Sequence, residues 1–469
     1  MRKRKRFLSI TMAALLATGL CACGNSDGAS SQTTAPEAPA SATEGSSNET
    51  VPEAEVQGED QETITLKFFN NEPTLTEKLN EINAEYTKRN PHVQIEVVDV
   101  PGADYYTKVD TTILSGEQLD ICFFNVKFDY TSRAAQGEFY PMDEFIQAEG
   151  VSSVTDLYTI DSSTEDGKVY GLPGDVKEYI IWLNKDDLEN AGLEIPPLNW
   201  TWDDFEEYAE KLTWGEGPDK HYGAMLYTWD HYNVLTAYNR LDDNPYLNKD
   251  GTLNLDDPAF RESLELRYRL EQEKQCAIPL SEVMATNLDF RTAFFSGKCS
   301  MLLMATNIIP QTADLENYPH TFETTYASFP MPADGRPGYA YADNRFYSIG
   351  ATTVNAEEAY KYIRYFTTEG IPMKGVTFTA DKGNTAGITD VVNRMTDSNP
   401  ELFDKEQLLK VLNNPDLKNN FWEYVPSYTG EIVNLYRAQA EKAVMGEISF
   451  DEALSVATQQ CQQVIDNNQ

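Results

Sequence analysis

The side chains of this chain that could do chemistry are mainly carboxylates and aromatic rings. The sequence holds 75 Asp and Glu residues against 37 Lys and Arg, together with 26 Tyr, 21 Phe and 6 Trp residues. Two carboxylates that face each other across a sugar can hydrolyse a glycosidic bond, whereas carboxylates combined with aromatic faces can bind a sugar without reacting with it. The sequence carries no HExxH, P-loop or GxSxG motif, and its four histidines are scattered. We therefore expect a binding protein with no catalytic residues.

The net charge of −38 restricts the class of partner. Such a chain is repelled by phosphate backbones and by anionic lipid headgroups, so neither nucleic acid nor an anionic membrane surface is expected as its ligand. The same charge is compatible with a cationic ligand, although an acidic surface also serves solubility. Charge alone does not name the ligand.

Four of the six cysteines lie in the predicted folded body, at Cys122, Cys276, Cys299 and Cys461. They lack the spacing of metal ligands, so no metal site and no cofactor is expected. Cys299 and Cys461 sit in apolar patterns and are interpreted as small buried residues. A disulfide between Cys276 and Cys299 is left open, because export permits it while the sequence does not set its geometry.

Residues 1–22 predict a lipoprotein signal peptide. A basic stretch precedes the apolar run from Phe7 to Leu20, which is too short to cross a bilayer as a mature helix. The following LCAC resembles a bacterial lipobox in which Cys23 receives the lipid, with Cys21 as the competing candidate. Residues 23–61, which hold the lipidated cysteine, are rich in Ser, Thr, Ala, Pro, Glu and Gly, and they predict a disordered tether. The predicted location is the outer face of the cell membrane, extracellular or periplasmic, with the lipid as the only anchor.

The elements that must position a site begin near residue 64. Strand patterns at residues 64–69, 93–97 and 120–124 alternate with helical spacing of apolar residues, such as Leu75, Leu79, Ile82 and Tyr86. This order predicts an α/β fold with a parallel sheet covered by helices. Ligands of such sheets lie at the carboxyl ends of the strands, which makes the residues that follow two of these strands candidates for the site: Asn71, Glu72, Asn125 and Lys127.

Thr201 and Asp204 have a structural explanation that competes with a catalytic one. Their spacing is that of a capping box, which predicts a helix over residues 202–212. The acidic residues of its first turn are then interpreted as charges that favour a helix N-terminus. Asn184 is interpreted in the same way, as the cap of the next helix upstream.

Several motifs occur in the order found in one family. They are LSGEQLDICFF, GKVYGLP, LNKDDLENAGLEIPPLNWTWDDFEEYAEKLT, FFSGKCSMLL and VMGEISFDEAL. Together they resemble the extracellular solute-binding proteins of bacterial ABC importers, in the carbohydrate-uptake group that includes maltose-binding protein. Leu119 and Cys299 depart from the family pattern, which usually has Pro and a small Ala there.

The resemblance implies a two-lobed α/β fold of the periplasmic-binding-protein type with a hinge between the lobes. The N-lobe is expected to hold residues 62–176 plus 348–390, and the C-lobe residues 177–347 plus 391–469. The chain then enters the C-lobe near Lys177, returns near Tyr347 and crosses again after Gly387. A monomeric receptor of this kind captures a sugar or oligosaccharide between its lobes and delivers it to the transmembrane subunits of an ABC permease.

The resemblance also implies ligand-binding residues. Phe124 and Asn307 fall where maltose-binding protein has stacking tryptophans, and these two changes argue against maltodextrin itself. Asp175 and Lys177 follow the GLP segment into the cleft, while Tyr341, Asp343 and Arg345 precede a strand predicted over residues 346–350. The complete set of candidate ligand-binding residues is Asn71, Glu72, Phe124, Asn125, Lys127, Asp175, Lys177, Trp229, Tyr232, Asn307, Tyr341, Asp343 and Arg345.

Core packing is the competing interpretation for the aromatic members of this set, Trp229 and Tyr232 among them. Two alternative functions also stay open from the sequence. One is a receptor of the same fold for a peptide or another polar solute, and the other is a surface glycosidase.

Overall fold

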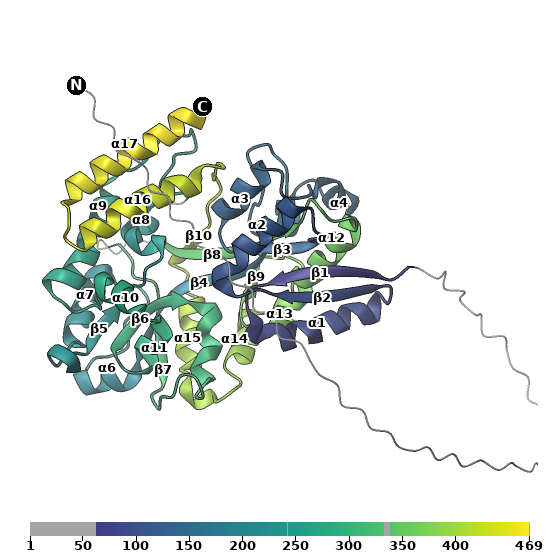
Figure 1. Cartoon of the computed structure of the whole chain (residues 1–469). Helices are drawn as coiled ribbons and strands as arrows, with labels where there is room; N and C mark the ends of the chain where they lie inside the picture. The colour runs from purple at the N-terminus through teal and green to yellow at the C-terminus, as the bar shows by residue number, and fades with distance from the viewer. Residues whose placement is uncertain (1–61, 242, 333–337, 469) are drawn as a thin grey trace, which may run out of the picture. The chain divides into compact units, whose positions relative to one another are not determined.

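Two long strands, β4 (Gly171–Asn184) and β8 (Gly338–Ile349), run side by side through the middle of the molecule (Figure 1). The computed structural model describes residues 62–241, 243–332 and 338–468. The described residues belong to one compact unit. The signal peptide, Cys23 and tether predicted for residues 1–61 lie outside the described residues.

One hydrophobic core, which we call the N-lobe core, surrounds the first three strands and contains Leu66, Phe123 and Tyr347. The pattern of apolar residues that predicted a strand, a helix and a second strand is confirmed here. The elements around this core are β1 (Ile64–Asn70), α1 (Thr76–Arg89), β2 (Val93–Asp99), α2 (Tyr105–Ser115), β3 (Ile121–Phe124), α3 (Lys127–Ala135), α4 (Asp143–Ala148), α5 (Val154–Leu157), α12 (Ala356–Tyr365), α13 (Ile371–Lys374) and β9 (Phe378–Thr379).

Two further cores lie on opposite faces of the sheet formed by β4, β6 and β5, and we call this part the C-lobe. Along β4, Ile181 and Leu183 join one core while Ile180 and Trp182 join the other, as successive side chains of a strand must. Burial on both faces explains the continuous apolar sequence of this strand. The remaining elements here are α6 (Lys185–Ala191), α7 (Trp202–Lys211), β5 (Tyr222–Met225), α8 (Leu235–Arg240), α9 (Pro258–Tyr268), α10 (Leu280–Thr286), α11 (Phe290–Phe295), β6 (Cys299–Ala305), β7 (Thr324–Ala327), α14 (Ile388–Met395), α15 (Lys405–Leu412), β10 (Leu417–Asn420), α16 (Thr429–Val444) and α17 (Phe450–Asn468).

The sheet is mixed, so the prediction of a parallel sheet is wrong for the pairs made by β4 and for the pairing of β8 with β3, while β5 pairs in parallel with β6 and β10 with β8. Its main path is β2-β1-β3-β8-β4-β6-β5. β1 pairs in parallel with β2 and β3, but β8 pairs antiparallel with both β3 and β4. β8 arrives from far along the chain and separates β3 from β4, which no local pattern could predict.

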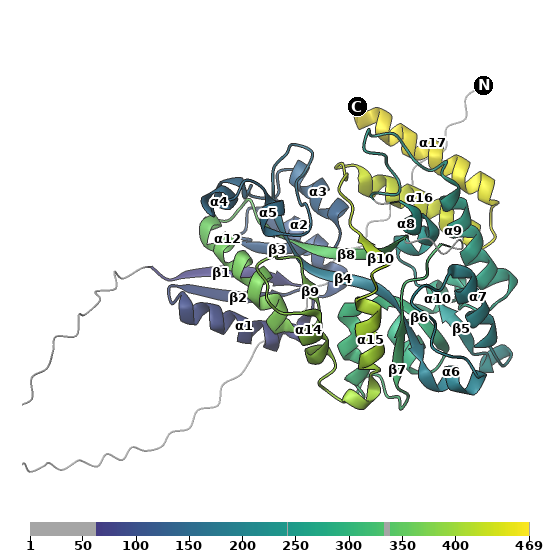
Figure 2. The same ribbon diagram turned by 180° about the vertical axis from the view of Figure 1, so that it is seen from behind.

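The strands β4 and β8 each contribute to more than one core. β4 has Val176 in the N-lobe core and Tyr179 in the C-lobe, while β8 passes from Tyr341 in the C-lobe to Phe346 in the N-lobe core. Figure 2 shows both strands joining the two groups of helices. The division of the chain into lobes at single residues stays a prediction.

Local details of the C-lobe test other expectations from the sequence. The capping box of Thr201 and Asp204 is confirmed at the start of α7, and Asn184 caps α6 through the amide of Asp187. The disulfide considered between Cys276 and Cys299 is absent, because both are buried free thiols and the Cys276 thiol is directed at the carbonyl of Leu270. No helix among the described residues has the length and apolarity that a membrane crossing requires.

Gly223 in β5 provides a test of the packing of α7 on the sheet. A Cβ at this position would overlap the carbonyl oxygen of Ala209, which is backbone and cannot move aside. We expect Gly223→Ala to lower the free energy of unfolding by about 3 kcal/mol, measured by urea denaturation. Gly102→Ala is the control, since its Cβ would make only an ordinary contact with Asn71 at 3.8 Å. Equal stability of the two variants would contradict this packing.

Candidate functional site

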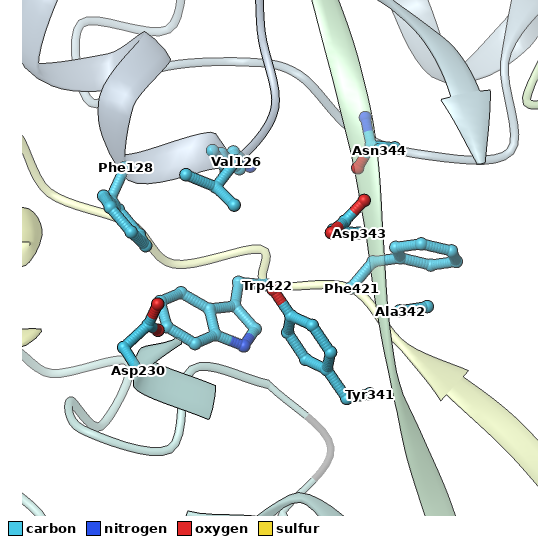
Figure 3. Close-up of a pocket in the computed structure, with 10 residues that line it drawn as sticks. Val126, Phe128, Asp230, Tyr341, Ala342, Asp343, Asn344, Phe421 and Trp422 are labelled. Atoms are coloured by element: carbon cyan, nitrogen blue, oxygen red, sulfur yellow. The ribbon is translucent and has the colours of Figure 1, made fainter. Parts of the chain in front are cut away.

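A cavity of about 30 Å³ lies where four separate segments converge (Figure 3). They are the turn from β3 into α3, the first residue of the short helix η4 (Asp230–Asn233), the middle of β8, and the loop that follows β10. A cavity of this volume accommodates a small polar group rather than a whole ligand. The residues that line it are Val126, Lys127, Phe128, Asp230, Tyr341, Ala342, Asp343, Asn344, Phe421 and Trp422.

Aromatic rings form much of the pocket wall. Phe128 and Trp422 have ring centroids 6.0 Å apart, and they come from opposite lobes, since Phe128 lies on α3. Tyr341 stacks on His231 at 4.1 Å and lies 4.7 Å from Tyr179, which fixes its ring. Flat apolar faces held in this way suit the C–H faces of a pyranose ring, while carboxylates and amides can bind its hydroxyls.

The polar lining includes two carboxylates in different surroundings. Asp343 forms an ion pair with Lys177 at 2.7 Å and accepts a long hydrogen bond from the hydroxyl of Tyr179 at 3.4 Å. Asp230 receives no hydrogen bond or ion pair from the side chain of any other described residue. Burial raises the pKa of Asp230 to about 6, with smaller contributions from Asp129 and Asp343, although a hydrogen bond from its own backbone amide and the charge of Arg437 oppose the shift.

Lys127 connects the lobes at the edge of this pocket. Its ammonium group donates hydrogen bonds to the carbonyl oxygens of Asp161, at 3.0 Å, and Glu423, at 2.9 Å. Burial lowers the pKa of Lys127, although the acidic groups around it act in the opposite direction. Lys127 belongs to the N-lobe, and Glu423 lies on the loop that follows β10 of the C-lobe. The hydrogen bond between them therefore forms only when the two lobes are close together.

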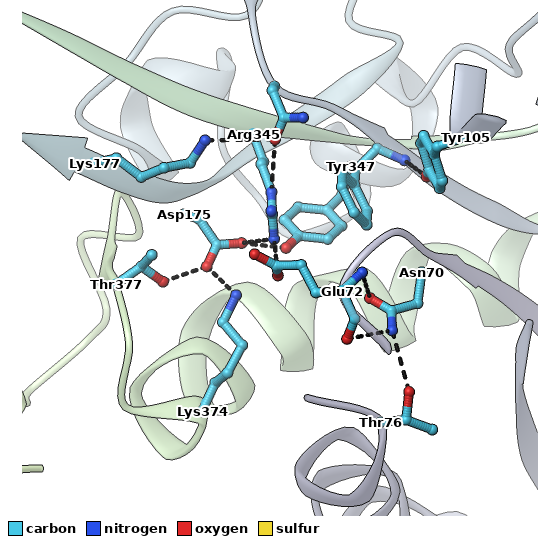
Figure 4. Close-up of polar contacts among 12 residues, drawn as sticks. Asn70, Glu72, Thr76, Tyr105, Asp175, Lys177, Arg345, Tyr347, Lys374 and Thr377 are labelled. Carbon is cyan, nitrogen blue, oxygen red and sulfur yellow. Dashed lines mark hydrogen bonds and ion pairs between the residues drawn. The ribbon is translucent and has the colours of Figure 1, made fainter. Parts of the chain in front are cut away.

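A second polar cluster lies beside the pocket, centred on Arg345 of β8 (Figure 4). The guanidinium donates to the Asn125 side chain at 2.9 Å and to Glu72 at 2.6 Å, and its cation lies 4.4 Å from the ring centroid of Phe123. Asn125 also accepts a hydrogen bond from Lys177 at 3.4 Å. These contacts connect the ends of β1 and β3 to both β4 and β8.

Asp175 of β4 completes this cluster. Its carboxylate, which is inaccessible to solvent, accepts hydrogen bonds from Lys374, Thr377 and Tyr347. Burial acts to raise the pKa of Asp175, but Lys374 and Arg345 outweigh it and hold the pKa well below its usual value. The same buried guanidinium lowers the pKa of Glu72 to about 2 against the effect of burial. Both carboxylates are therefore ionised and paired, which makes the cluster a structural connection between the strands.

The structure distributes the predicted site residues between three environments. Lys127, Tyr341 and Asp343 line the pocket, while Glu72, Asn125, Asp175, Lys177 and Arg345 form the adjoining cluster. Contrary to the prediction that Tyr341, Asp343 and Arg345 precede a strand, they lie within β8, because pairing with β4 and then with β10 extends the strand to Gly338.

The other predicted residues lie away from the pocket lining. Phe124 is fully buried against Tyr106 and Phe139, and Tyr232 is fully buried with its hydroxyl bound to the carbonyl of Leu303. Trp229 packs on Tyr227 and Phe290, Asn307 is partly buried at the start of the helix η6 (Thr306–Ala313), and Asn71 is partly buried after β1. Ligand binding by each of these residues stays a prediction.

Seven pocket residues were not predicted from the sequence: Val126, Phe128, Asp230, Ala342, Asn344, Phe421 and Trp422. Most lie next to a predicted residue, so a wider window around each strand end would have found them. Phe421 and Trp422 had no such signal, because the short strand before them is polar. Within the ranges that the structure describes, no group of His, Cys, Asp and Glu side chains is placed to hold a metal ion.

The fold and its interlobe pocket are those of a solute-binding protein, and comparison with known families agrees. Residues 72–371 match the family described as bacterial extracellular solute-binding protein. The match covers more than half of the chain, which therefore belongs to this family.

Individual relatives are more distant. The chain is 24% identical to the multiple sugar-binding protein of Streptococcus mutans over 319 residues, which is 65% of this chain and 71% of that protein. A sugar transporter of Rhizobium etli, solved in an open conformation, has a TM-score of 0.67 and 23% identity over 85% of this chain and 99% of its own. An ABC substrate-binding protein of Listeria monocytogenes, solved with cycloalternan, has a TM-score of 0.69 and 20% identity. That comparison covers 87% of this chain and 100% of the Listeria chain.

The ion pair of Glu72 and Arg345 predicts a loss of stability in acid. Because the folded state lowers the pKa of Glu72 from 4.5 to about 2, its contribution is complete above pH 4.5 and is lost as the pH falls toward 2. Between pH 5 and 2 we expect the natural chain to lose about 3 kcal/mol more unfolding free energy than Glu72→Gln, measured by urea denaturation. Glu117→Gln, at an exposed position, should follow the natural chain. If the unfolding free energy of Glu72→Gln fell with pH as steeply as that of the natural chain, the stabilising ion pair of Glu72 and Arg345 would be contradicted.

Proposed function

We propose that the chain is the substrate-binding receptor of an ABC importer, which captures a sugar or oligosaccharide in the interlobe pocket and delivers it to a membrane permease. The observation that carries this proposal is the composition of the pocket, in which aromatic faces from both lobes surround carboxylates and an amide. The sugars in the names of the relatives from Streptococcus mutans and Listeria monocytogenes support the same ligand class.

Binding would act through closure of the two lobes. A ligand in this pocket touches α3 of the N-lobe together with Asp230 and Trp422, so it contacts both lobes only when they are close. It therefore favours the closed form, in proportion to its greater affinity for that form. β4 and β8 are the proposed hinge, and the permease would recognise the closed receptor. This function needs no chemical step, so we propose that the chain is not an enzyme.

We also propose that the receptor is a monomer tethered to the outer face of the membrane by lipid on Cys23. The proposed division is residues 62–176 plus 348–390 for the N-lobe and residues 177–347 plus 391–469 for the C-lobe. Val176 in the N-lobe core and Tyr179 and Val391 in the C-lobe cores support this division. Phe346 packs in the N-lobe core, so the return to the N-lobe begins slightly before residue 348.

The direct test is a thermal-shift screen of the purified chain against monosaccharides, oligosaccharides and peptides. A ligand that binds only the folded state adds about 2.7 kcal/mol of stability at a hundredfold excess over its dissociation constant. We expect at least one sugar to raise the melting temperature and to be recovered unchanged after long incubation. Consumption of the sugar would favour a glycosidase, and a response to peptides alone would favour the other class of receptor.

Trp422 should carry part of the affinity for the sugar found in this screen. We expect Trp422→Ala to weaken binding at least about tenfold, because it removes an apolar face that stacks on the ligand, as measured by isothermal titration calorimetry. Trp214→Ala is the matched control, since Trp214 is about half exposed and is not part of the pocket lining. Unchanged affinity in Trp422→Ala would place the ligand elsewhere.

The lipid anchor is tested at the two neighbouring cysteines. We expect Cys23→Ser to release the chain from the membrane fraction and to prevent incorporation of labelled palmitate, because the lipid needs the Cys23 thiol. Cys21→Ser should stay membrane-bound and labelled. The opposite pattern would assign the lipid to Cys21, and labelling of both variants would exclude a single acceptor.

A further inference from the structure

Asp230 is an ionisable group in the pocket wall for which the described residues supply no counter-charge. Its carboxylate lines the pocket together with the rings of Phe128 and Trp422 (Figure 3). No cation of residues 62–241, 243–332 or 338–468 pairs with it. A partly buried carboxylate that receives a hydrogen bond only from its own backbone amide and has no cationic partner costs free energy, which a ligand can recover by bringing a further donor.

The positive groups around the pocket are already engaged elsewhere. Lys177 pairs with Asp343, and Lys127 donates to the two carbonyl groups of Asp161 and Glu423. The Arg437 guanidinium pairs with Glu441 at 2.6 Å and also donates to the carbonyl of Thr228 at 2.8 Å.

The remaining titratable neighbours do not supply a positive charge either. Asp129 adds a negative charge close to Asp230, and its nearest cation, Arg133, pairs more closely with Asp110, at 2.8 Å against 3.9 Å. His231 is buried beneath Tyr341, and burial holds its pKa well below 6.5, so its ring is neutral at pH 7. The net charge of the side chains around Asp230 is therefore negative.

Aromatic faces beside an unpaired carboxylate are the surroundings that bind an organic ammonium group. The faces of Trp and Phe attract a cation, and the carboxylate adds a charge-assisted hydrogen bond. A neutral sugar uses the same carboxylate only through hydroxyl donors, which leaves its charge uncompensated.

We propose that the pocket selects a positively charged ligand, an amino sugar with a free amine, whose ammonium group binds Asp230 beside the rings of Phe128 and Trp422. This inference rests on the proposed function and specifies its substrate class.

The test compares matched sugars on the purified full chain by isothermal titration calorimetry at pH 7. The probes are glucose, galactose, mannose and cellobiose, each with its 2-amino and N-acetylamino counterpart, which differ only at the nitrogen-bearing carbon. In at least one series we expect the free amine to bind about tenfold or more tightly than both the neutral sugar and the N-acetyl form. This preference is measured on the natural chain and does not depend on the folding of a variant.

Asp230→Asn tests whether the carboxylate is the cause, because the amide keeps the shape and removes the charge. We expect the ratio of amine to neutral affinity to fall to about one in this variant. Asp397→Asn, at an exposed position away from the pocket lining, should keep the ratio of the natural chain. Melting temperatures of both variants report on their folding.

The outcomes separate the two proposals. Neutral sugars that bind as tightly as their amines in every series would overturn the charged ligand and leave the sugar receptor intact. An amine preference that survives in Asp230→Asn would overturn the role of Asp230. Absence of binding by every member of the panel would count against the sugar receptor and, with it, the amino-sugar ligand.

Discussion

The burial of charged side chains where β4 and β8 cross between the lobes is the constraint on which the rest of the structure depends. Two strands that belong to both lobes cannot turn all their polar groups to water. Asp175 and Arg345 are therefore paired with groups from several other elements, among them Glu72 and Lys374. Removing either member of such a buried pair leaves an uncompensated charge, which is far more costly than the net gain from forming the pair.

This cluster also determines the geometry of the pocket. Lys177 reaches Asn125 on one side and Asp343 on the other, so the carboxylate that faces the pocket is held by the same network that joins the strands. Asn125 comes immediately before the turn that carries Lys127 into the pocket wall. A movement of one lobe about β4 and β8 would thus change the pocket and the cluster together, which is the coupling that a hinge requires.

The sequence predicted those parts that depend on nearby residues. The periodic apolar pattern of α1, the capping box of α7 and the apolar runs of β1 and β3 each have a local cause. β8 does not, because Asp343 and Arg345 interrupt its apolar pattern and are compatible with a strand only through partners on β4 and just beyond the ends of β1 and β3. The position of Trp422 depends likewise on a contact with Phe128, almost 300 residues earlier in the chain. Chemistry-bearing residues were therefore easier to predict than the partners that decide their role.

The partners separate residues that hold the structure from residues that are available to a ligand. Arg345 and Asp175 have the residue types of a binding site, but each is saturated by neighbours and has little capacity for a further contact. Asp230 lies in an ordinary loop sequence, yet no side chain of the described residues donates a hydrogen bond to its carboxylate. A ligand that supplies this donor removes an electrostatic cost present only when the pocket is formed, and so stabilises the closed arrangement over any open one. Free capacity for hydrogen bonding, more than residue type, is what connects binding to closure in this fold.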